Sequence, residues 1–444
     1  MWRALHVDDK LEYFNNTVNY LFDCYVPLRT VNIINKSCPW YTPRVRRHIQ
    51  VRNRLRSKWK NNPTSYNWEN FRISRNFTLL AIRKAKEQNF KSKLNPTLPP
   101  KQLWKRLKSI GIGSKNRAPC NLSPDVLNDY FLSNSSCVNR GLDVVSQPGE
   151  IGFSFPGVHE ADIASKINQI KSNATGADGI SLKFIKILLP YVLSPLTAII
   201  NLIFTSSCFP SLWKSGIVIP IAKKPTPKFV ADYRPISILP VLSKVCELIM
   251  AEKINEYVKD NNLLHPLQSG FRRYHSCCTA MLKVVDDIRI NYDNKHITLL
   301  CLLDYTKAFD SVDHTLLCDK LGSLFHFSSN AVQLIKSYLS NRSQRVKVLN
   351  VYSEAKYNRV GVPQGSVLGP LLFSLFLNDI FTNVRYVSIH AYADDLQLYL
   401  SDNIGRLSVL CRNINEDLRN IARWSDNNRL HLNPNKSFVL PICI

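Results

Sequence analysis

Two adjacent acids, Asp394 and Asp395, are the strongest candidates for chemistry in this sequence. They interrupt residues 387–400, in which apolar side chains alternate with polar ones, a pattern typical of half-buried strands. The pattern predicts a hairpin with both acids at its tip. Neighbouring carboxylates repel, which raises the pKa of one of them unless cations neutralise the charge. Their oxygens suit Mg²⁺ or Mn²⁺; a solvated acidic turn is the simpler alternative.

A third acid, Asp304, directly follows an unbroken apolar run at residues 297–303. Such a run predicts a buried, central strand with the acid at its exit. If neighbouring strands bring Asp304 against Asp394 and Asp395, three carboxylates face two cations. This is the arrangement used in two-metal phosphoryl displacement.

A glycine-rich block at residues 361–370 lies between these acids along the chain. Gln364 stands there beside Gly365, where close approach of a ligand is sterically easy. Ser366 is a favourable N-cap for an apolar helix predicted over residues 367–381. The block therefore predicts a loop that leads into a buried helix.

The chain of 444 residues carries a formal net charge of +25, and the charge is unevenly spread. Residues 44–117 contain 21 Lys and Arg against two acids, Glu69 and Glu87. Their pattern predicts two long basic helices, at residues 44–60 and 66–94, and a short one at 101–110. This charge is expected of a protein that binds a polyanion and releases its counterions; the alternative is a basic surface that only aids solubility.

Cysteine usage and hydropathy narrow the class of protein. The twelve cysteines are scattered, with no zinc-type spacing, and the first 14 residues lack the apolar core of a secretory signal. We therefore expect reduced thiols in an intracellular protein. The most apolar segment, residues 187–204, is interrupted by prolines and polar residues, which favours buried helices over a membrane span.

Helix-like and strand-like segments mix without the regular alternation of a doubly wound sheet, which predicts an α+β fold. We expect a basic helical N-terminal extension at residues 1–110. A polar linker is expected at residues 111–156. The catalytic domain is then expected at residues 157–444, with its core at about 205–444.

From about residue 155 the chain resembles the reverse transcriptases of non-LTR (LINE-like) retrotransposons, most closely the jockey-type group. The resemblance implies a right-hand polymerase with fingers and palm, in which the palm combines an antiparallel sheet with helices. It implies an RNA template, a DNA primer or target DNA, and deoxynucleoside triphosphates as partners, with no membrane. Ordered blocks carry the resemblance, at residues 173–180, 233–237, 268–272, 304–310, 363–366, 392–395 and 432–436.

The resemblance also implies roles for single residues. Asp304, Asp394 and Asp395 match the ligands of two Mg²⁺ ions, with Mn²⁺ as a substitute. Lys436 matches a lysine that protonates the leaving pyrophosphate. Phe309 matches a steric gate that leaves no room for a 2′-hydroxyl. The remaining candidates for nucleotide binding are Lys223, Lys224, Arg234, Arg272, Gln364, Gly365 and Tyr392.

Asp310 and Asp313 follow the gate and are expected to fix the next turn and the start of the next helix, so we exclude them from the metal ligands. An RNA-copying RNA polymerase would need a polar or acidic group at the gate position. The apolar ring of Phe309 argues against that function. A maturase would need a further domain.

We expect neither an endonuclease before this region nor a thumb after it, which predicts a truncated chain. The main alternative function is accordingly a catalytically inactive, nucleic-acid-binding remnant. We expect the protein to be intracellular, in the nucleus and cytoplasm, as a ribonucleoprotein.

Overall fold

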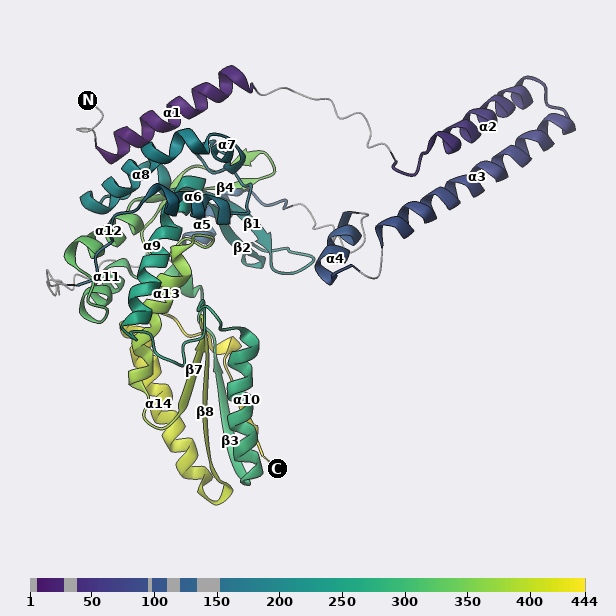
Figure 1. The fold of residues 1–444 in the computed structure, drawn as a ribbon. Coiled ribbons are helices and arrows are strands. Elements are labelled where there is room, and N and C mark those ends of the chain that lie inside the picture. The colour runs from purple at the N-terminus through teal and green to yellow at the C-terminus, as the bar shows by residue number, and fades with distance from the viewer. Residues whose placement is uncertain (1–5, 28–37, 95–97, 110–119, 134–151, 444) are drawn as a thin grey trace. The chain divides into compact units, whose positions relative to one another are not determined.

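The computed structural model describes residues 6–27, 38–94, 98–109, 120–133 and 152–443. The chain divides into two compact units. One consists of Met1–Val26 and Ala118–Ile444 and is called the main unit here; the other, Pro27–Arg117, is called the basic unit. Figure 1 shows the elements of both units.

The described residues form α-helices of 6 to 29 residues. These are α1 (Val7–Tyr25), α2 (Pro43–Asn61), α3 (Ser65–Lys93), α4 (Pro100–Ser109), α5 (Pro124–Phe131), α6 (Glu160–Gln169), α7 (Leu182–Ile187), α8 (Leu189–Ser206), α9 (Val241–Asp260), α10 (Cys277–Asp293), α11 (His314–Ser323), α12 (Ser329–Leu339), α13 (Leu368–Leu377) and α14 (Leu407–Asn427).

The strands form two sheets. They are β1 (Ser215–Ala222), β2 (Tyr233–Ile238), β3 (His296–Leu303), β4 (Arg342–Val348), β5 (Val351–Tyr352), β6 (Lys356–Asn358), β7 (Ser388–Tyr392), β8 (Asp395–Asn403) and β9 (Phe438–Ile442). The five-stranded sheet has the order β2-β1-β4-β5 with β6 beside β4, and the four-stranded sheet has the order β7-β8-β3-β9. All pairs are antiparallel except β1 with β4. The predicted α+β class is confirmed.

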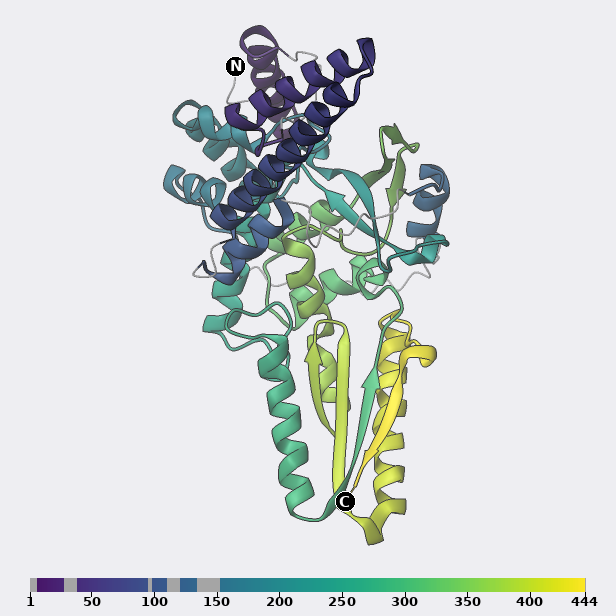
Figure 2. The same ribbon diagram turned by 90° about the vertical axis from the view of Figure 1, so that its right-hand side faces the viewer.

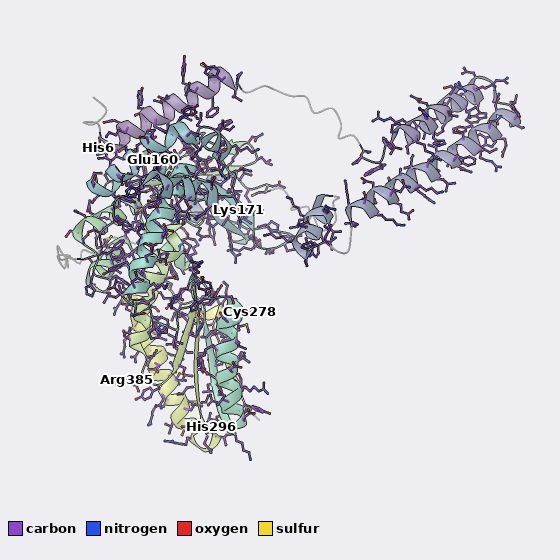
Figure 3. The ribbon with its side chains drawn as sticks, viewed as in Figure 1. His6, Glu160, Lys171, Cys278, His296 and Arg385 are labelled. Atoms are coloured by element: carbon purple, nitrogen blue, oxygen red, sulfur yellow. The ribbon has the colours of Figure 1, made fainter. Side chains whose placement is uncertain are left out.

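The four-stranded sheet carries the predicted central strand. The apolar run forms β3, which pairs with β8 on one side and β9 on the other. Helices α14 and α10 lie on opposite faces of this sheet (Figures 1 and 2). His296 marks the far end of the sheet in Figure 3, so β3 runs from there towards the helical part of the main unit and delivers Asp304 to it.

The helical core of the main unit is built around α13. Nine of its ten residues are buried, as expected for a helix that is apolar on every side. It contacts α9 and α11. The predicted helix 367–381 is confirmed in position, although its last part continues as a 3-10 helix at Asn378–Asn383. This core joins the two sheets, because the chain enters α13 from the loop beside β2 and leaves it towards β7.

Helix α8 is the one described helix long and apolar enough to cross a membrane by length and composition alone. In the structure it contacts α1, α6 and α12. Six of its residues are buried in the main core. It therefore packs as the predicted interior helix.

The units divide the chain differently from the predicted limits of 1–110, 111–156 and 157–444. Helix α1 belongs to the main unit, where Ser211 donates its N–H and hydroxyl to Asp8 Oδ1 at 2.7 and 2.9 Å. The ring of Phe22 stacks on Phe184 with 3.8 Å between centroids. The predicted linker contains α5, which packs on β4. The part of that linker at residues 134–151 lies outside the described residues.

The basic unit is an antiparallel pair of helices, α2 and α3, followed by α4. Thr42 and Thr64 cap the two long helices by accepting from the N–H groups of Val45 and Asn67. Trp59 lies 4.8 Å from Trp68, and its ring stacks on Phe71 at 5.9 Å. These rings hold the helices together, which is the simpler of the two roles that such aromatics have in a basic helix pair.

Candidate active site

The tip of the β7–β8 hairpin is a tight turn that packs against the loop at residues 268–272. Tyr392 pairs with Asp395, and Ala393 adopts a left-handed conformation with φ of 59°. Gly270 packs directly against this turn, where a Cβ would lie 2.2 Å from the nitrogen of Ala393. Ser269 N–H donates to Ala391 at 2.8 Å. The predicted hairpin is confirmed, and the block at residues 268–272 positions its tip.

Asp304 lies at the exit of β3 and meets the segment that leads into β9. Its Oδ2 accepts from Lys436 Nζ at 3.1 Å and from Asn433 Nδ2 at 3.3 Å. Its backbone carbonyl accepts from Asn433 N–H at 2.8 Å. Asn433 also caps the 3-10 turn at Pro434–Lys436, so one asparagine fixes both the acid and the lysine beside it.

The three predicted metal ligands are electrostatic neighbours. Burial, Asp395 and Asp304 raise the pKa of Asp394, while Lys436 opposes the shift. Burial and then Asp304 raise the pKa of Asp395, again against Lys436. Like charges brought together in this way favour protonation unless a cation intervenes.

Among the described residues, no group of three or more His, Cys, Asp or Glu is arranged so that it could hold a metal ion. The three acids therefore affect one another electrostatically without forming a closed set of ligands, and Lys436 engages Asp304. Their donor chemistry fits Mg²⁺, which prefers carboxylate oxygens and retains several waters of its own. The assignment of Asp304, Asp394 and Asp395 to the metal stays a prediction.

Phe309, five residues after Asp304, is half-buried in an aromatic group. Its ring stacks on Phe373 of α13 with 4.5 Å between centroids and meets the edge of Phe271 at 5.9 Å. Its carbonyl accepts from Val362 N–H at 2.8 Å. The two ring contacts and this backbone hydrogen bond fix Phe309 relative to the core, as a rigid steric gate requires.

Gln364 and Gly365 lie against β2. Ser237 N–H donates to the Gln364 carbonyl at 2.7 Å. A Cβ on Gly365, whose φ is 109°, would lie 2.7 Å from the Ser237 carbonyl oxygen. Ser366 Oγ accepts from Gly369 N–H at 3.0 Å, so it satisfies a first-turn N–H as predicted, but Val367 and not Ser366 occupies the N-cap position of α13. The loop is therefore held against the five-stranded sheet at one end and α13 at the other.

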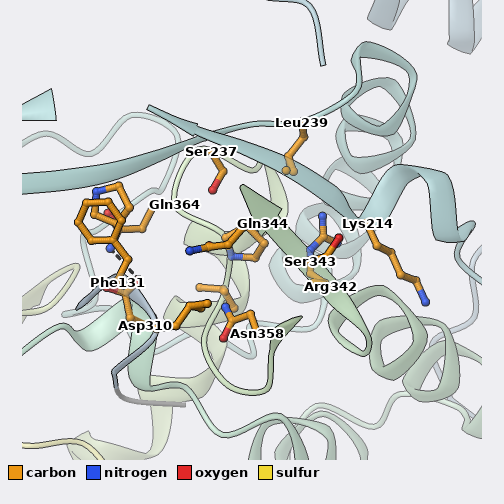
Figure 4. Close-up of a pocket in the computed structure, with 15 residues that line it drawn as sticks. Phe131, Lys214, Ser237, Leu239, Asp310, Arg342, Ser343, Gln344, Asn358 and Gln364 are labelled. Atoms are coloured by element: carbon orange, nitrogen blue, oxygen red, sulfur yellow. Dashed lines mark hydrogen bonds between the residues drawn. The ribbon is translucent and has the colours of Figure 1, made fainter. Parts of the chain in front are cut away.

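Asp310 connects this loop to the gate. Its Oδ1 accepts from Gln364 Nε2 at 2.9 Å. Burial raises the pKa of Asp310 to about 6, against the opposing effects of Gln364 and two nearby lysines. Figure 4 shows Asp310, Gln364 and Phe131 at one end of a pocket that extends to Arg342. Asp310 thus orients the amide of Gln364 as well as occupying the turn predicted for it.

The predicted phosphate-binding cations divide into two kinds. Burial and then the charges of Arg234 and Lys436 lower the pKa of Lys223, so Lys223 feels both of these cations. Arg234 lies on β2 opposite Ile221 and is exposed. Lys224 instead pairs with Asp232 at 2.9 Å. Lys223 Nζ donates to the Ala231 carbonyl at 2.8 Å, so both lysines are held by neighbours on the chain, whereas Arg234 is exposed.

Arg272 and Asp313 have structural partners. Arg272 Nη1 donates to the carbonyls of His265 and Gln268 at 3.0 and 3.1 Å, which closes the loop that supports the hairpin. Asp313 caps α11 by accepting from two backbone N–H groups and forms an ion pair with Arg429. The prediction that Asp313 starts a helix is confirmed, and the nucleotide-binding role of Arg272 stays a prediction.

Three residues of the site were not predicted from the sequence. Asn433 lies within the block at residues 432–436, and an asparagine directly before a proline is a signal for a turn. Lys307 lies between Asp304 and Phe309 along the chain. Burial lowers the pKa of Lys307, and the charges of Asp310 and Lys223 shift that pKa in opposite directions.

Glu247 of α9, the third of these residues, has a fully buried side chain. Its Oε2 accepts from Val367 and Leu368 N–H at 2.7 and 3.3 Å, so it caps α13 from another helix. No local pattern reveals such a contact.

Comparison with known proteins identifies the fold. Residues 221–441 match the family described as "Reverse transcriptase (RNA-dependent DNA polymerase)". The chain is 32% identical over 305 residues to a probable RNA-directed DNA polymerase from transposon BS of Drosophila melanogaster, covering 67% of this chain and 33% of that protein. It is 31% identical over 316 residues to the RNA-directed DNA polymerase from mobile element jockey of the same organism, covering 69% and 34%.

The chain thus spans about a third of the length of these relatives. Among solved structures, a telomerase from Candida tropicalis matches 52% of this chain and 50% of its own, with a TM-score of 0.36 and 12% identity. The family match at residues 221–441 includes the whole order of the site, from the strand that precedes Asp304 to the hairpin and Lys436.

Proposed function

The chain belongs to the reverse transcriptase family, among the jockey-type non-LTR retrotransposon polymerases, and we propose that it copies RNA into DNA. In this proposal it adds deoxynucleotides to the 3′ end of a DNA primer paired with an RNA template. The four-stranded sheet with its helices is the palm, and the five-stranded sheet belongs to the fingers. The observation that carries the proposal is that Asp304, at the exit of β3, lies beside the β7–β8 turn that holds Asp394 and Asp395, since β3 pairs with β8.

Asp304, Asp394 and Asp395 would hold two Mg²⁺ ions, which lower the pKa of the primer 3′-hydroxyl and neutralise charge on the phosphates. Lys223 and Arg234 bind the triphosphate from the side of the five-stranded sheet. Lys436 gives a proton to the leaving pyrophosphate, a step that requires a positioned acid. Lys436 is paired with Asp304 here, so the two side chains would separate for Asp304 to hold a metal ion.

Phe309 and Gln364 select and orient the nucleotide. The Phe309 ring rests on Phe373 and excludes a 2′-hydroxyl without offering it a hydrogen bond. Asp310 accepts from the Gln364 amide, which directs the remaining polar atoms of that side chain towards the nucleotide and template. Sugar selection in this proposal is therefore a property of packed residues rather than of a mobile loop.

The basic unit binds the phosphate backbone of nucleic acid. Helix α2 contains eight Lys and Arg and no acid, and almost all of those cations are exposed. On α3 two cations pair locally, Arg72 with Glu69 and Lys91 with Glu87. Binding driven by this unpaired charge should weaken steeply as salt is raised, because counterions are released from the phosphates.

The second candidate function is a catalytically inactive protein that binds nucleic acid. The observation that favours it is that the described acids do not form a closed ligand set. Primer extension on an RNA template with Mg²⁺, and RNA binding measured over a range of salt, separate the two. Extension supports the polymerase; salt-sensitive RNA binding without extension under any metal condition supports the inactive protein.

A further inference from the structure

Helix α5 lies in the segment predicted as a linker, yet it is packed firmly on the five-stranded sheet. Leu127 and Phe131 are buried on its inner face and share a small core with Val218, Tyr233 and Val346. Pro124 occupies the first turn of the helix, where its missing N–H costs nothing. The apolar side of this short helix is therefore fully used in packing.

Polar contacts fix the helix further. Asn128 is fully buried, and its amide donates to Ser353 Oγ at 3.1 Å and to the Glu354 carbonyl at 3.0 Å. Gln344 Nε2 donates to Asn128 Oδ1 at 2.9 Å. Asp125 Oδ1 accepts from Glu354 N–H at 2.9 Å. A buried amide satisfied on both sides specifies one position for the helix, because any slip leaves polar groups unpaired.

The C-terminal end of α5 holds Lys307. Lys307 Nζ donates to the Tyr130 carbonyl at 3.0 Å and to Ser133 Oγ at 2.9 Å, and it lies 4.2 Å from the centroid of the Tyr130 ring. An ammonium at a helix C-terminus and over an aromatic face is favoured on both counts. Lys307 itself has a left-handed backbone with φ of 48°, a conformation that persists only where the surroundings hold it.

Lys307 is also the start of the turn that carries the gate. Its carbonyl accepts from Asp310 N–H at 2.9 Å and from Ser311 Oγ at 3.1 Å, which shapes the 3-10 helix Ala308–Ser311 that contains Phe309. Asp310 in turn holds Gln364. A displacement of Lys307 therefore reaches both the gate and the neighbouring nucleotide contact.

We propose that α5 is a positioning element of the nucleotide site, and that it acts through Lys307 on the turn between Asp304 and Phe309. The inference rests on the proposed polymerase function and adds a part of the chain outside the matched region 221–441 to the selection of the sugar. Lys307 is a positioning residue here, since its ammonium contacts the carbonyl and ring of Tyr130 on α5 and the hydroxyl of Ser133 just after it.

The test uses the full chain with four substitutions. Lys307→Met removes the ammonium at similar size, and Tyr130→Leu removes the ring without touching the active-site turn. Lys307→Arg keeps a cation and is the conservative rescue. Lys259→Met, at an exposed lysine near the end of α9, is the matched control. Each variant is checked for native circular dichroism before use.

Two readouts are measured. The first is the ratio of kcat/KM for deoxynucleotide over ribonucleotide addition. The second is amide hydrogen exchange at residues 306–311, which requires no activity. We expect Lys307→Met and Tyr130→Leu each to lower the ratio by roughly tenfold and to speed exchange, with Lys307→Arg and Lys259→Met close to the unchanged chain.

The inference is overturned if Lys307→Met raises KM equally for both sugars with exchange unchanged, since that result assigns Lys307 to the triphosphate. It is also overturned if Tyr130→Leu matches the unchanged chain in both readouts. If the unchanged chain extends no primer, the proposed function fails, and exchange alone then decides whether α5 holds the turn.

Discussion

Lys436 Nζ lies 3.1 Å from Asp304 Oδ2, so the proposed general acid and a proposed metal ligand are paired with each other. The pair joins the turn before β9 to the exit of β3, and Asn433 braces it from the same turn. A metal ion bound at Asp304 competes with this lysine for the same oxygen. Lys436 therefore affects the site in two opposite ways, as a rival of the metal and as a proton donor.

The substitution Lys436→Met separates these effects. Loss of the ammonium leaves three acids with stronger mutual repulsion, so the Mg²⁺ concentration for half-maximal activity should fall. The kcat should fall by roughly 10²-fold, because the leaving pyrophosphate loses its acid. Titration of activity with Mg²⁺ measures both quantities. A rise in the Mg²⁺ requirement, or an unchanged kcat, contradicts the assignment.

Replacing Phe309 with alanine should admit ribonucleotides. Removal of the ring opens the space beneath the sugar, and the preference for deoxynucleotides should drop by at least about tenfold. Single-nucleotide addition with matched deoxy and ribo substrates gives the ratio. Phe271→Ala, which removes only the edge contact on the gate ring, should have a smaller effect. Equal discrimination in Phe309→Ala and the unchanged chain removes this residue from the gate.

Glu247→Ala should destabilise the main unit. The change leaves the N–H groups of Val367 and Leu368 without their buried acceptor, at a cost of roughly 2–4 kcal/mol in the free energy of unfolding. Urea unfolding followed by tryptophan fluorescence measures the loss. Glu256→Ala on the same helix breaks an exposed pair with Lys253 and should cost less than about 1 kcal/mol. Equal costs for the two variants refute the capping role.

Asp178 should make stability depend on pH. Burial raises the pKa of Asp178 to about 6 from the ordinary value of 3.8 for an aspartate, so the native state holds its proton more tightly than the unfolded chain. Its contribution is fully present below about pH 4 and is lost as pH rises through 6, by at most about 3 kcal/mol. Asp178→Asn should flatten this decline, whereas Asp260→Asn, at the exposed end of α9, should keep it. Unfolding free energies between pH 4 and 8 provide the measurement.

The elements that carry the acids were predictable because their patterns are local. The apolar run before Asp304 and the alternation around Asp394 each report burial residue by residue. The cap at Ser366 follows from a short-range preference in the same way.

Helix α5 was missed for a physical reason. It has eight residues, too few to be stable alone, and it is held by Asn128 and by apolar contacts with strands far along the chain. Glu247 and Lys307 were missed likewise, since their partners are 120 and more than 170 residues away. Contacts between residues so far apart in the chain depend on the tertiary structure, and no local sequence pattern indicates them.

The most direct test of the account compares Asp394→Asn with Asp402→Asn. Both replace an acid of the hairpin region, but Asp402 lies towards the other end of β8 and pairs there with Ile297. Single-deoxynucleotide addition to a DNA primer on an RNA template with Mg²⁺ is measured for each. We predict at least about a 10³-fold loss of rate for Asp394→Asn, because transition-state charge goes unneutralised, and a nearly unchanged rate for Asp402→Asn. Addition by Asp394→Asn at the rate of the unchanged chain contradicts the account.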